Sequence, residues 1–574
     1  MKNKSYPYYE SHVITDLKDL LSQSVEQHRD KPAFWVKSGK NEPYAPISYL
    51  KFGRDVRELG SALLMLGMAN KKVAIIGENR YEWAASYMAA AICSEMVVPI
   101  DRELPQNDVH SLFNAAEVGC VIYSAKLGDC VRAWNKTQKE PVILINMDID
   151  EDNETEYSIK RVKEKGGALL DSGDSSFDDV VIDPAAPKIL LFTSGTTSTP
   201  KGVLLSHGNL AANLTNMCKM IAIRLDDIFL SVLPLHHTYE CTCGFLCPIY
   251  RGASVAYGEG LKQVLSNLKE SSATVMLAVP ALFETMYRRV WANARKTGKD
   301  SKLKTGLKIS RLAMRFGIDV RRKLFAELHA MLGGKLRLFI SGAAAADPEV
   351  SKGFRELGIN FLQGYGITEC SPIVAVNRDF CYKDNAAGLI LPNMDVKLVN
   401  KDENGIGEIV CRGGNVMLGY YNNEEATAAA FDDGWFKTGD LAIIDDDGFV
   451  IITGREKNVI VTSNGKNIYP EELEYLVSKH LEVSECMVYG EKSEKDQELQ
   501  ICIQVLPDLE YIQEVHGEKT PDEIKKMIEG FISDINKANP LYKYIRNVYL
   551  REDEFVKTTT RKIKRYAQTP QQQE

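Results

Sequence analysis

What this 574-residue sequence lacks excludes several classes of protein. It has no run close to the roughly 20 consecutive apolar residues of a membrane-spanning helix, and its start, MKNKSYPYYES, has no apolar signal-peptide core. The 12 cysteines include no CxxC pair of the zinc-binding type. We therefore expect a cytoplasmic protein in which Cys241, Cys243 and Cys247 are reduced and buried, a redox or metal role being the less favoured alternative.

The sequence also lacks the excess of positive charge that a general nucleic-acid binder carries. Its formal net charge is -8, so we expect no nucleic-acid partner. With 44% hydrophobic and 26% charged residues, the composition is that of a globular protein. The length is too great for one core and fits a large domain followed by a smaller one.

One segment departs from the acidic average. Between Arg288 and Arg337 there are 15 Lys and Arg residues against three acidic residues, a net charge of +12. Such a segment is either a solvated helical face or a docking surface for anionic lipid headgroups. The sequence alone leaves both interpretations open.

Short apolar runs alternate with amphipathic stretches through the first 450 or so residues, which predicts an α/β sheet architecture. The strand-like runs are residues 71–79, 187–195, 274–280 and 335–342, and the helix-like stretches include 81–93 and 281–295. After Lys457 we expect a smaller α+β domain with strands near Val488 and Ile501 and helices over 471–480 and 522–538. The predicted domains are residues 1–456 and 457–574.

The segment TSGTTSTPKG, from Thr193 to Gly202, is rich in hydroxyls and glycines and ends in a lysine. Such a run presents backbone N–H groups, hydroxyls and one cation to a polyphosphate. It differs from a nucleotide P-loop because Pro200 precedes Lys201 and Gly202 follows it, so the lysine does not open a helix. We therefore predict that the chain binds ATP through a loop between strands.

Three further motifs follow in order: YGITE (Tyr365 to Glu369), TGD (Thr438 to Asp440) and GREKN (Gly454 to Asn458). Together with TSGTTSTPKG and the basic TTTRKIKR (Thr558 to Arg565), the set resembles the adenylate-forming superfamily from about Leu17 to Arg565. That superfamily includes acyl-CoA synthetases, firefly-luciferase-like enzymes and peptide-synthetase adenylation domains. The segments LPLHHTYE (Leu233 to Glu240) and 318–347 resemble the long-chain fatty acyl-CoA synthetases in particular.

The resemblance implies a role for each motif residue. The residues that would contact ATP are Thr193, Ser194, Gly195, Thr196, Thr197, Lys201, Gly342, Ala343, Gly364, Tyr365, Gly366, Thr368, Asp440, Arg455 and Lys562. Of these, Tyr365 would stack on adenine, Asp440 would accept hydrogen bonds from the ribose hydroxyls, and Thr193 with Glu369 would hold Mg²⁺, which prefers oxygen ligands. His237 would stand at the entrance of the acyl pocket.

The basic segment from Thr558 to Arg565 resembles the superfamily's last motif but differs from it at one position. Lys562 matches the lysine that bridges the substrate carboxylate and the α-phosphate, but Arg561 replaces the glycine that usually precedes it, and Ser198 replaces a glycine in the phosphate loop. Arg561, Lys562 and Lys564 are therefore all candidate cations, and the spacing to Ile563 and Arg565 favours Lys562.

Lys457 occupies the superfamily's hinge position, about which the small domain rotates between the two half-reactions. The segment VTSNGKNIYPEE resembles the part that lines the CoA channel, with Gly465 and Lys466 as the CoA-binding residues. The implied reaction adenylates a medium- to long-chain fatty acid and transfers the acyl group to CoA. Delivery to an acyl carrier protein is the first alternative, and a non-catalytic nucleotide-binding protein is the second.

Overall fold

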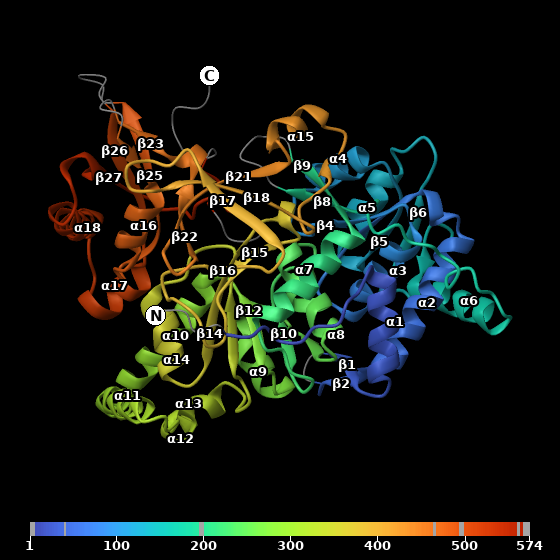
Figure 1. Ribbon diagram of the computed structural model, residues 1–574, viewed down its shortest axis with the longest axis horizontal. Coiled ribbons are helices and arrows are strands. Elements are labelled where there is room, and N and C mark those ends of the chain that lie inside the picture. The colour runs from blue at the N-terminus through green and yellow to red at the C-terminus, as the bar shows by residue number, and fades with distance from the viewer. Residues whose placement is uncertain are drawn as a thin grey trace.

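The computed structural model describes residues 6–39, 42–193, 200–462, 466–492, 499–558 and 563–565. Figure 1 shows a large body, coloured blue to orange, and a smaller part at one side, orange-red to red, that is formed by the C-terminal segment. None of the described helices combines the length and apolar composition that crossing a bilayer requires.

One sheet of the large body is built mainly from the first 206 residues. Among the described residues it has eight strands in the order β19-β9-β8-β4-β3-β5-β6-β7. The bounds are β3 (Lys72–Ile76), β4 (Met96–Ile100), β5 (Val118–Tyr123), β6 (Ile143–Asn146), β7 (Tyr157–Ser158), β8 (Pro187–Thr193), β9 (Lys201–Ser206) and β19 (Gly419–Tyr420). Strand β8 pairs with β9 in antiparallel register, so Thr193 lies opposite Lys201 where the predicted phosphate loop leaves and rejoins the sheet.

In the second sheet of the large body, the strands are mainly parallel up to β14 (Asn360–Gly366) and antiparallel beyond it. Its parallel half contains β11 (Ser254–Tyr257), β10 (Ile228–Ser231), β12 (Val275–Ala278), β13 (Leu338–Ser341) and β14. Beyond β14 the strands β15 (Ile373–Val376), β16 (Gly388–Ile390), β22 (Phe449–Arg455), β21 (Trp435–Ile444), β18 (Gly407–Gly413) and β17 (Met394–Val399) are antiparallel. The carboxyl ends of parallel strands meet at one edge, where α/β sheets bind ligands.

Apolar side chains from both sheets merge into a continuous core. Helix α3 (Tyr81–Cys93) is buried along nearly its whole length, since it packs between β3 and helix α2 (Tyr49–Met65). Trp83 and Tyr87 stack within it with ring centroids 5.4 Å apart. This rigid core fixes the strand ends that carry the motifs.

The C-terminal segment has a sheet and a core of its own. Strands β25 (Val483–Lys492), β26 (Leu499–Pro507) and β27 (Ile545–Leu550) pack against α16 (Pro470–Ser478) and α18 (Pro521–Lys537). A separate hydrophobic cluster is the physical basis for a second folding unit. The boundary at residue 457 stays a prediction.

Most predicted elements are confirmed. The strand-like runs became β3, β8, β12 and β13, and the helix-like stretches became α3 and α10 (Pro280–Lys296). The large α/β part with a smaller C-terminal part is also confirmed. All 12 cysteines are free, and Cys241, Cys243 and Cys247 are buried as expected.

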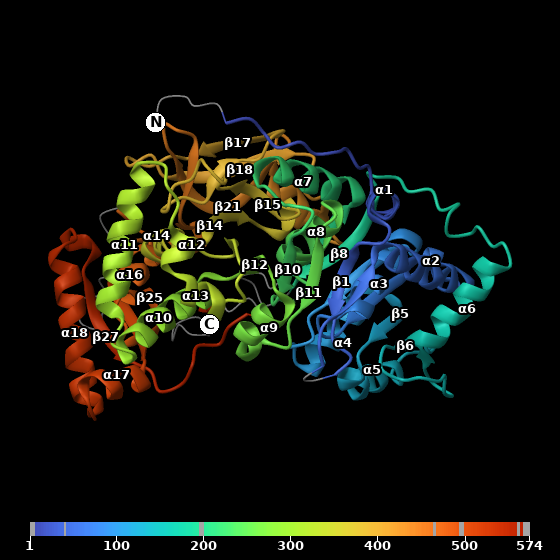
Figure 2. The same ribbon diagram turned by 90° about the horizontal axis from the view of Figure 1, so that it is seen from below.

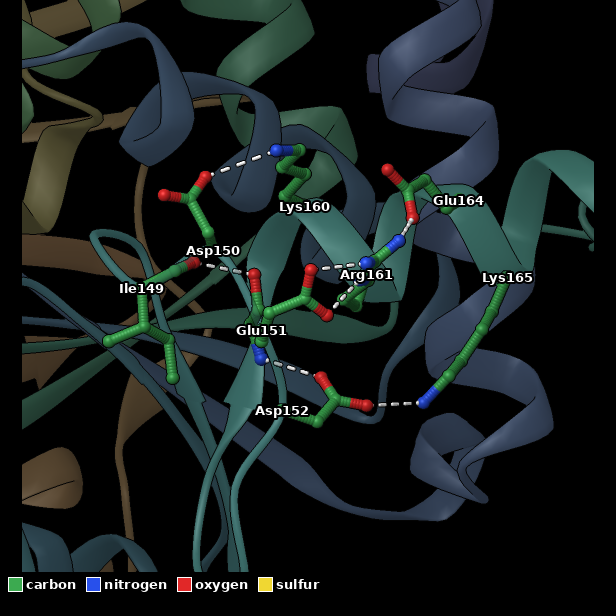
Figure 3. Close-up of polar contacts among 9 residues, drawn as sticks. Ile149, Asp150, Glu151, Asp152, Lys160, Arg161, Glu164 and Lys165 are labelled. Atoms are coloured by element: carbon green, nitrogen blue, oxygen red, sulfur yellow. Dashed lines mark hydrogen bonds and ion pairs between the residues drawn. The ribbon is translucent and has the colours of Figure 1, made fainter.

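Basic side chains of helix α6 (Ile159–Asp171) form ion pairs with acidic residues of the stretch between β6 and this helix, and one pair lies within the helix (Figure 3). The pairs are Asp150 with Lys160, Glu151 with Arg161, Glu164 with Arg161, and Asp152 with Lys165. Within the described ranges no three His, Cys, Asp or Glu side chains are grouped to hold a metal ion. The stretch is therefore a surface ion-pair network.

Candidate active site

A large cavity of about 4130 Å³ opens at the carboxyl edge of the parallel strands. The residues after β13 and at the end of β14 line it from the large body, and residues around β25 line it from the C-terminal segment. Its lining includes most of the predicted site: Thr193, His237, Gly342, Ala343, Gly364, Tyr365, Gly366, Thr368, Glu369, Asp440, Arg455 and Lys457. The fold thus brings together motifs that lie up to 264 residues apart in the sequence.

The YGITE and TGD motifs meet directly. The Tyr365 hydroxyl donates to Asp440 Oδ2 at 2.7 Å, and Arg455 Nε lies 2.9 Å from Asp440 Oδ1. Burial, together with the Asp440 carboxylate, raises the pKa of Tyr365 well above its ordinary value, so the hydroxyl keeps its proton. Asp440 is only 4% exposed, yet its two oxygens can each accept a further hydrogen bond.

The turn after β13 presents backbone to the cavity. Ala343 has a φ of 71°, in the left-handed region that residues with a side chain rarely adopt. A Cβ on Gly342 would lie 2.8 Å from Cζ of Tyr239, whose hydroxyl donates to the carbonyl of Ile340 at 2.9 Å. Tyr239 therefore leaves no room for a side chain at Gly342.

Glu369 is connected to the phosphate-loop strand through Tyr420. The Tyr420 hydroxyl donates to Glu369 Oε1 at 3.1 Å, and the Lys201 Nζ lies 4.7 Å from the centre of the Tyr420 ring. Burial raises the pKa of Glu369, while Tyr420 and Arg455 oppose that rise. The sequence reasoning missed Tyr420, because no motif marks it and it lies 51 residues from Glu369.

Two of the residues predicted to contact ATP, Thr193 and Lys201, lie at the two ends of the predicted phosphate loop. Thr193 ends β8, and its hydroxyl lies 3.4 Å from the carbonyl of Lys201. Lys201 begins β9 and does not line the cavity in this arrangement. Ser194, Gly195, Thr196 and Thr197 lie outside the described residues.

His237 lines the cavity together with a set of apolar side chains. Its ring is 4.1 Å from the ring of His236, and burial lowers the pKa of His236 to about 3, so that ring is neutral. The apolar part of the lining is formed by Met217, Ile221, Ile223, Phe229, Val232, Cys243 and Cys247. Glu240 also lines the cavity, one turn beyond His237.

The comparisons agree with this geometry. Residues 21–421 match the AMP-binding enzyme family. The chain belongs to that family. It is 28% identical over 82% of its length to the long-chain-fatty-acid–CoA ligase FadD15 of Mycobacterium bovis, of which it covers 80%. It is 30% identical over 78% of its length to the long-chain-fatty-acid–CoA ligase 6 of Mus musculus, of which it covers 68%.

The fold of this AMP-binding enzyme is also found in solved structures. The anthranilate CoA ligase AuaEII, crystallised with anthranoyl-AMP, has a TM-score of 0.75 to the chain at 19% identity. The match covers 99% of this chain and 98% of that one. At this identity the comparison establishes the fold, namely a large α/β part and a smaller C-terminal part.

In the C-terminal segment of this AMP-binding enzyme, some predicted site residues lie outside the described residues. Lys562 and Gly465 lie outside the described residues, although Thr558 and Ile563, on either side of the lysine segment, line the cavity. Lys466 is not in the cavity lining, and its Nζ lies 2.5 Å from Glu403 Oε1 of the large body. The roles of these residues stay predictions.

Proposed function

We propose that the protein activates a medium- to long-chain fatty acid with ATP and transfers the acyl group to CoA, releasing pyrophosphate and AMP. The observation that supports this most is the lining of the cavity. It carries the polar residues Tyr365, Asp440 and Glu369 and also, together with His237, an apolar part formed by Met217, Ile221, Ile223, Phe229, Val232, Cys243 and Cys247. A nucleotide fits the first environment and an alkyl chain the second.

The chemistry needs two displacements. An oxygen of the fatty-acid carboxylate attacks the α-phosphorus of ATP, and the bond to pyrophosphate breaks. The thiolate of CoA then attacks the carbonyl carbon of the acyl adenylate, and AMP leaves. Both reactants of the first step are anionic, so cations and N–H donors are needed around the phosphates.

The described residues suit parts of this task. Asp440 would hold the ribose hydroxyls, Arg455 lies beside it, and the backbone at Gly342 and Ala343 would line the adenine slot. His237 would orient the substrate carboxylate, which needs no general base because it is ionised at neutral pH. Lys562 would neutralise charge on the α-phosphate.

Mg²⁺ bound to ATP fits the donor set. Burial raises the pKa of the Glu369 carboxyl, and the Tyr420 hydroxyl and Arg455 only oppose that rise. A hard cation at this carboxylate, with the Thr193 hydroxyl as a further oxygen ligand, would compensate its negative charge and would screen the phosphate charges.

The acceptor distinguishes two versions of this function. A carrier-protein thiol would react with the same acyl adenylate as CoA does, and the cavity alone does not select between them. We favour CoA because the curated relatives named above are CoA ligases. A non-catalytic nucleotide-binding protein is disfavoured, since Glu369 and Asp440 stand together in one cavity.

The test separates the half-reactions. Wild-type protein should catalyse exchange between pyrophosphate and ATP that depends on a fatty acid, and should form thioester with free CoA over a panel of acids of rising chain length. Lys562→Ala should abolish the exchange but retain CoA transfer from supplied acyl adenylate, because the cation is needed only while charge builds on the α-phosphate. Exchange without thioester would support the carrier-protein acceptor. Absence of exchange with every acid would refute the proposal.

A further inference from the structure

Helix α11 (Asp300–Arg315) lies on the outside of the molecule and buries little of its surface. Leu307 and Ser310 are its only buried residues among 16. Figure 1 shows α11 with α12 (Arg321–Leu324) and α13 (Ala326–Met331) at one outer corner, and Figure 2 shows α11 in the view from below, with α18 of the C-terminal segment farther out on the same side. Most of this helix therefore faces away from the protein.

The outward side of α11 is apolar along its centre. Ile309 is 49% exposed, Leu312 57% and Phe316, directly after the helix, 75%. Their spacing of three and four residues places them on one face. Ile318, Leu324 and Met331 are exposed farther along the same segment. Contiguous exposed apolar residues of this kind mark an interaction surface.

Basic side chains lie beside and in line with this apolar stripe. At 3.6 residues per turn, Lys308 and Arg315 lie along one side of the stripe, and Lys302 lies in line with Ile309 two turns nearer the start of the helix. These three have no ion pair with any residue in the described part of the chain, whereas Arg311 pairs with Glu356 at 2.7 Å. We call Ile309, Leu312, Phe316, Lys302, Lys308 and Arg315 the α11 face.

We propose that the α11 face docks on an anionic lipid bilayer, with the apolar stripe in the headgroup region and the three cations against lipid phosphates and carboxylates. An apolar stripe with adjacent unpaired cations is the pattern of helices that lie in a membrane interface. The surrounding segment from Arg288 to Arg337 has a net charge of +12, of which Arg311 and Arg337 are paired with Glu356 and Asp227 outside it. The remaining positive charge near α11 adds attraction to anionic lipid. A second copy of the chain fits worse, because a two-fold contact would place these cations against themselves.

This inference is independent of the proposed function, because vesicle binding is measured without ATP, acid or CoA. Full-length protein is mixed with vesicles of phosphatidylcholine and phosphatidylserine, or of phosphatidylcholine alone, and the bound fraction is measured by sedimentation. Wild type should bind the anionic vesicles at least about tenfold more strongly, and this preference should fade as salt shortens the range of charge attraction.

Two sets of substitutions test the two halves of the face. The triple variant Lys302→Gln, Lys308→Gln and Arg315→Gln should bind anionic vesicles about a hundredfold less, at roughly fivefold per cation near the surface. The double variant Leu312→Ser and Phe316→Ser should bind roughly tenfold less at every salt concentration, because the apolar contribution is not screened.

The matched control removes the same charge elsewhere. Lys160→Gln, Arg161→Gln and Lys165→Gln also deletes three cations, but each is paired with an acidic residue of the neighbouring stretch (Figure 3). This variant should bind vesicles like wild type. Equal losses in the control and the α11 triple variant would refute a localised face. Dimerisation of wild type that the double variant abolishes, with vesicle binding unchanged, would assign the face to a second copy instead.

Discussion

At the residue scale, Glu240 ends the LPLHHTYE segment, but the resemblance assigns no role to its side chain. The residue is 1% exposed, and neither carboxyl oxygen has a hydrogen-bond partner among the described residues. Burial raises the pKa of Glu240 from 4.5 to about 8, against a smaller lowering by the Ser231 hydroxyl, which lies near but does not meet hydrogen-bond geometry. The raised pKa keeps the carboxyl mostly neutral at neutral pH, because burial without hydrogen-bond partners disfavours the charged form.

Glu240→Gln should change how stability depends on pH. Between pH 4.5 and about 8 the folded protein holds a proton that the unfolded chain releases, so the Glu240 contribution is full below pH 4.5 and is lost as pH rises towards 8. The slope is about 1.4 kcal/mol per pH unit. The variant lacks this titration, so its Tm relative to that of wild type should increase as pH rises from 4.5 towards 8. A difference in Tm that does not change with pH would contradict the raised pKa.

At the element scale, the π-helix η3 (Tyr239–Leu246) contributes Tyr239, Glu240 and Cys243 to the lining of the cavity. A π-helix is rare and commonly marks a functional site. Cys243 projects from it into the cavity lining, with its Sγ 3.8 Å from the Sδ of Met217. Substitution at this position should therefore alter the room for an acyl chain.

Cys243→Phe should shorten the preferred acid. The added ring fills space beside the apolar part of the cavity lining, so kcat/KM for long-chain acids should fall by about tenfold or more, while short-chain acids are little affected. Cys243→Ala, which removes one atom, is the control and should keep the wild-type order of acids. Thermal unfolding checks that the phenylalanine variant is folded. A uniform fall across the panel would place the acyl chain elsewhere.

At the scale of the whole molecule, the contacts between the C-terminal segment and the large body include a hydrogen bond and an ion pair. Such polar contacts can break and be replaced by contacts with water when two parts move. Tyr469 donates to Asp402 Oδ2 at 2.9 Å, and Lys466 pairs with the adjacent Glu403. Lys457 lies in the short helical turn η6 (Glu456–Asn458), between β22 and the start of the C-terminal segment. This position is suitable for a hinge between two folded parts.

Lys457→Pro should separate the half-reactions. Proline fixes φ and restricts rotation at this residue. If the protein is held in its adenylating arrangement, acyl adenylate should form at close to the wild-type rate while thioester output falls at least about tenfold. Lys457→Ala keeps φ free and should retain both activities. Equal loss of both half-reactions in the proline variant would leave no support for a hinge here.

Local sequence patterns sufficed for much of the fold. Strands β3, β8, β12 and β13 and helix α3 were predictable because apolar runs bounded by turn-forming residues have few alternatives. The pairing of strands was not predictable, since β9 is followed in its sheet by β19, more than 200 residues farther along the chain. Such pairing depends on which apolar faces pack together in the complete core.

The sequence by itself determined the family, because the TSGTTSTPKG, YGITE and TGD motifs occur in order along one chain, and it named the residues that we predict to carry the chemistry. Only the tertiary structure placed Tyr365 against Asp440 and Tyr420 against Glu369, since these contacts span 75 and 51 residues. It also decided that the basic segment exposes an apolar stripe. Exposure depends on which helix face the core leaves uncovered, and that is a property of packing, not of local sequence.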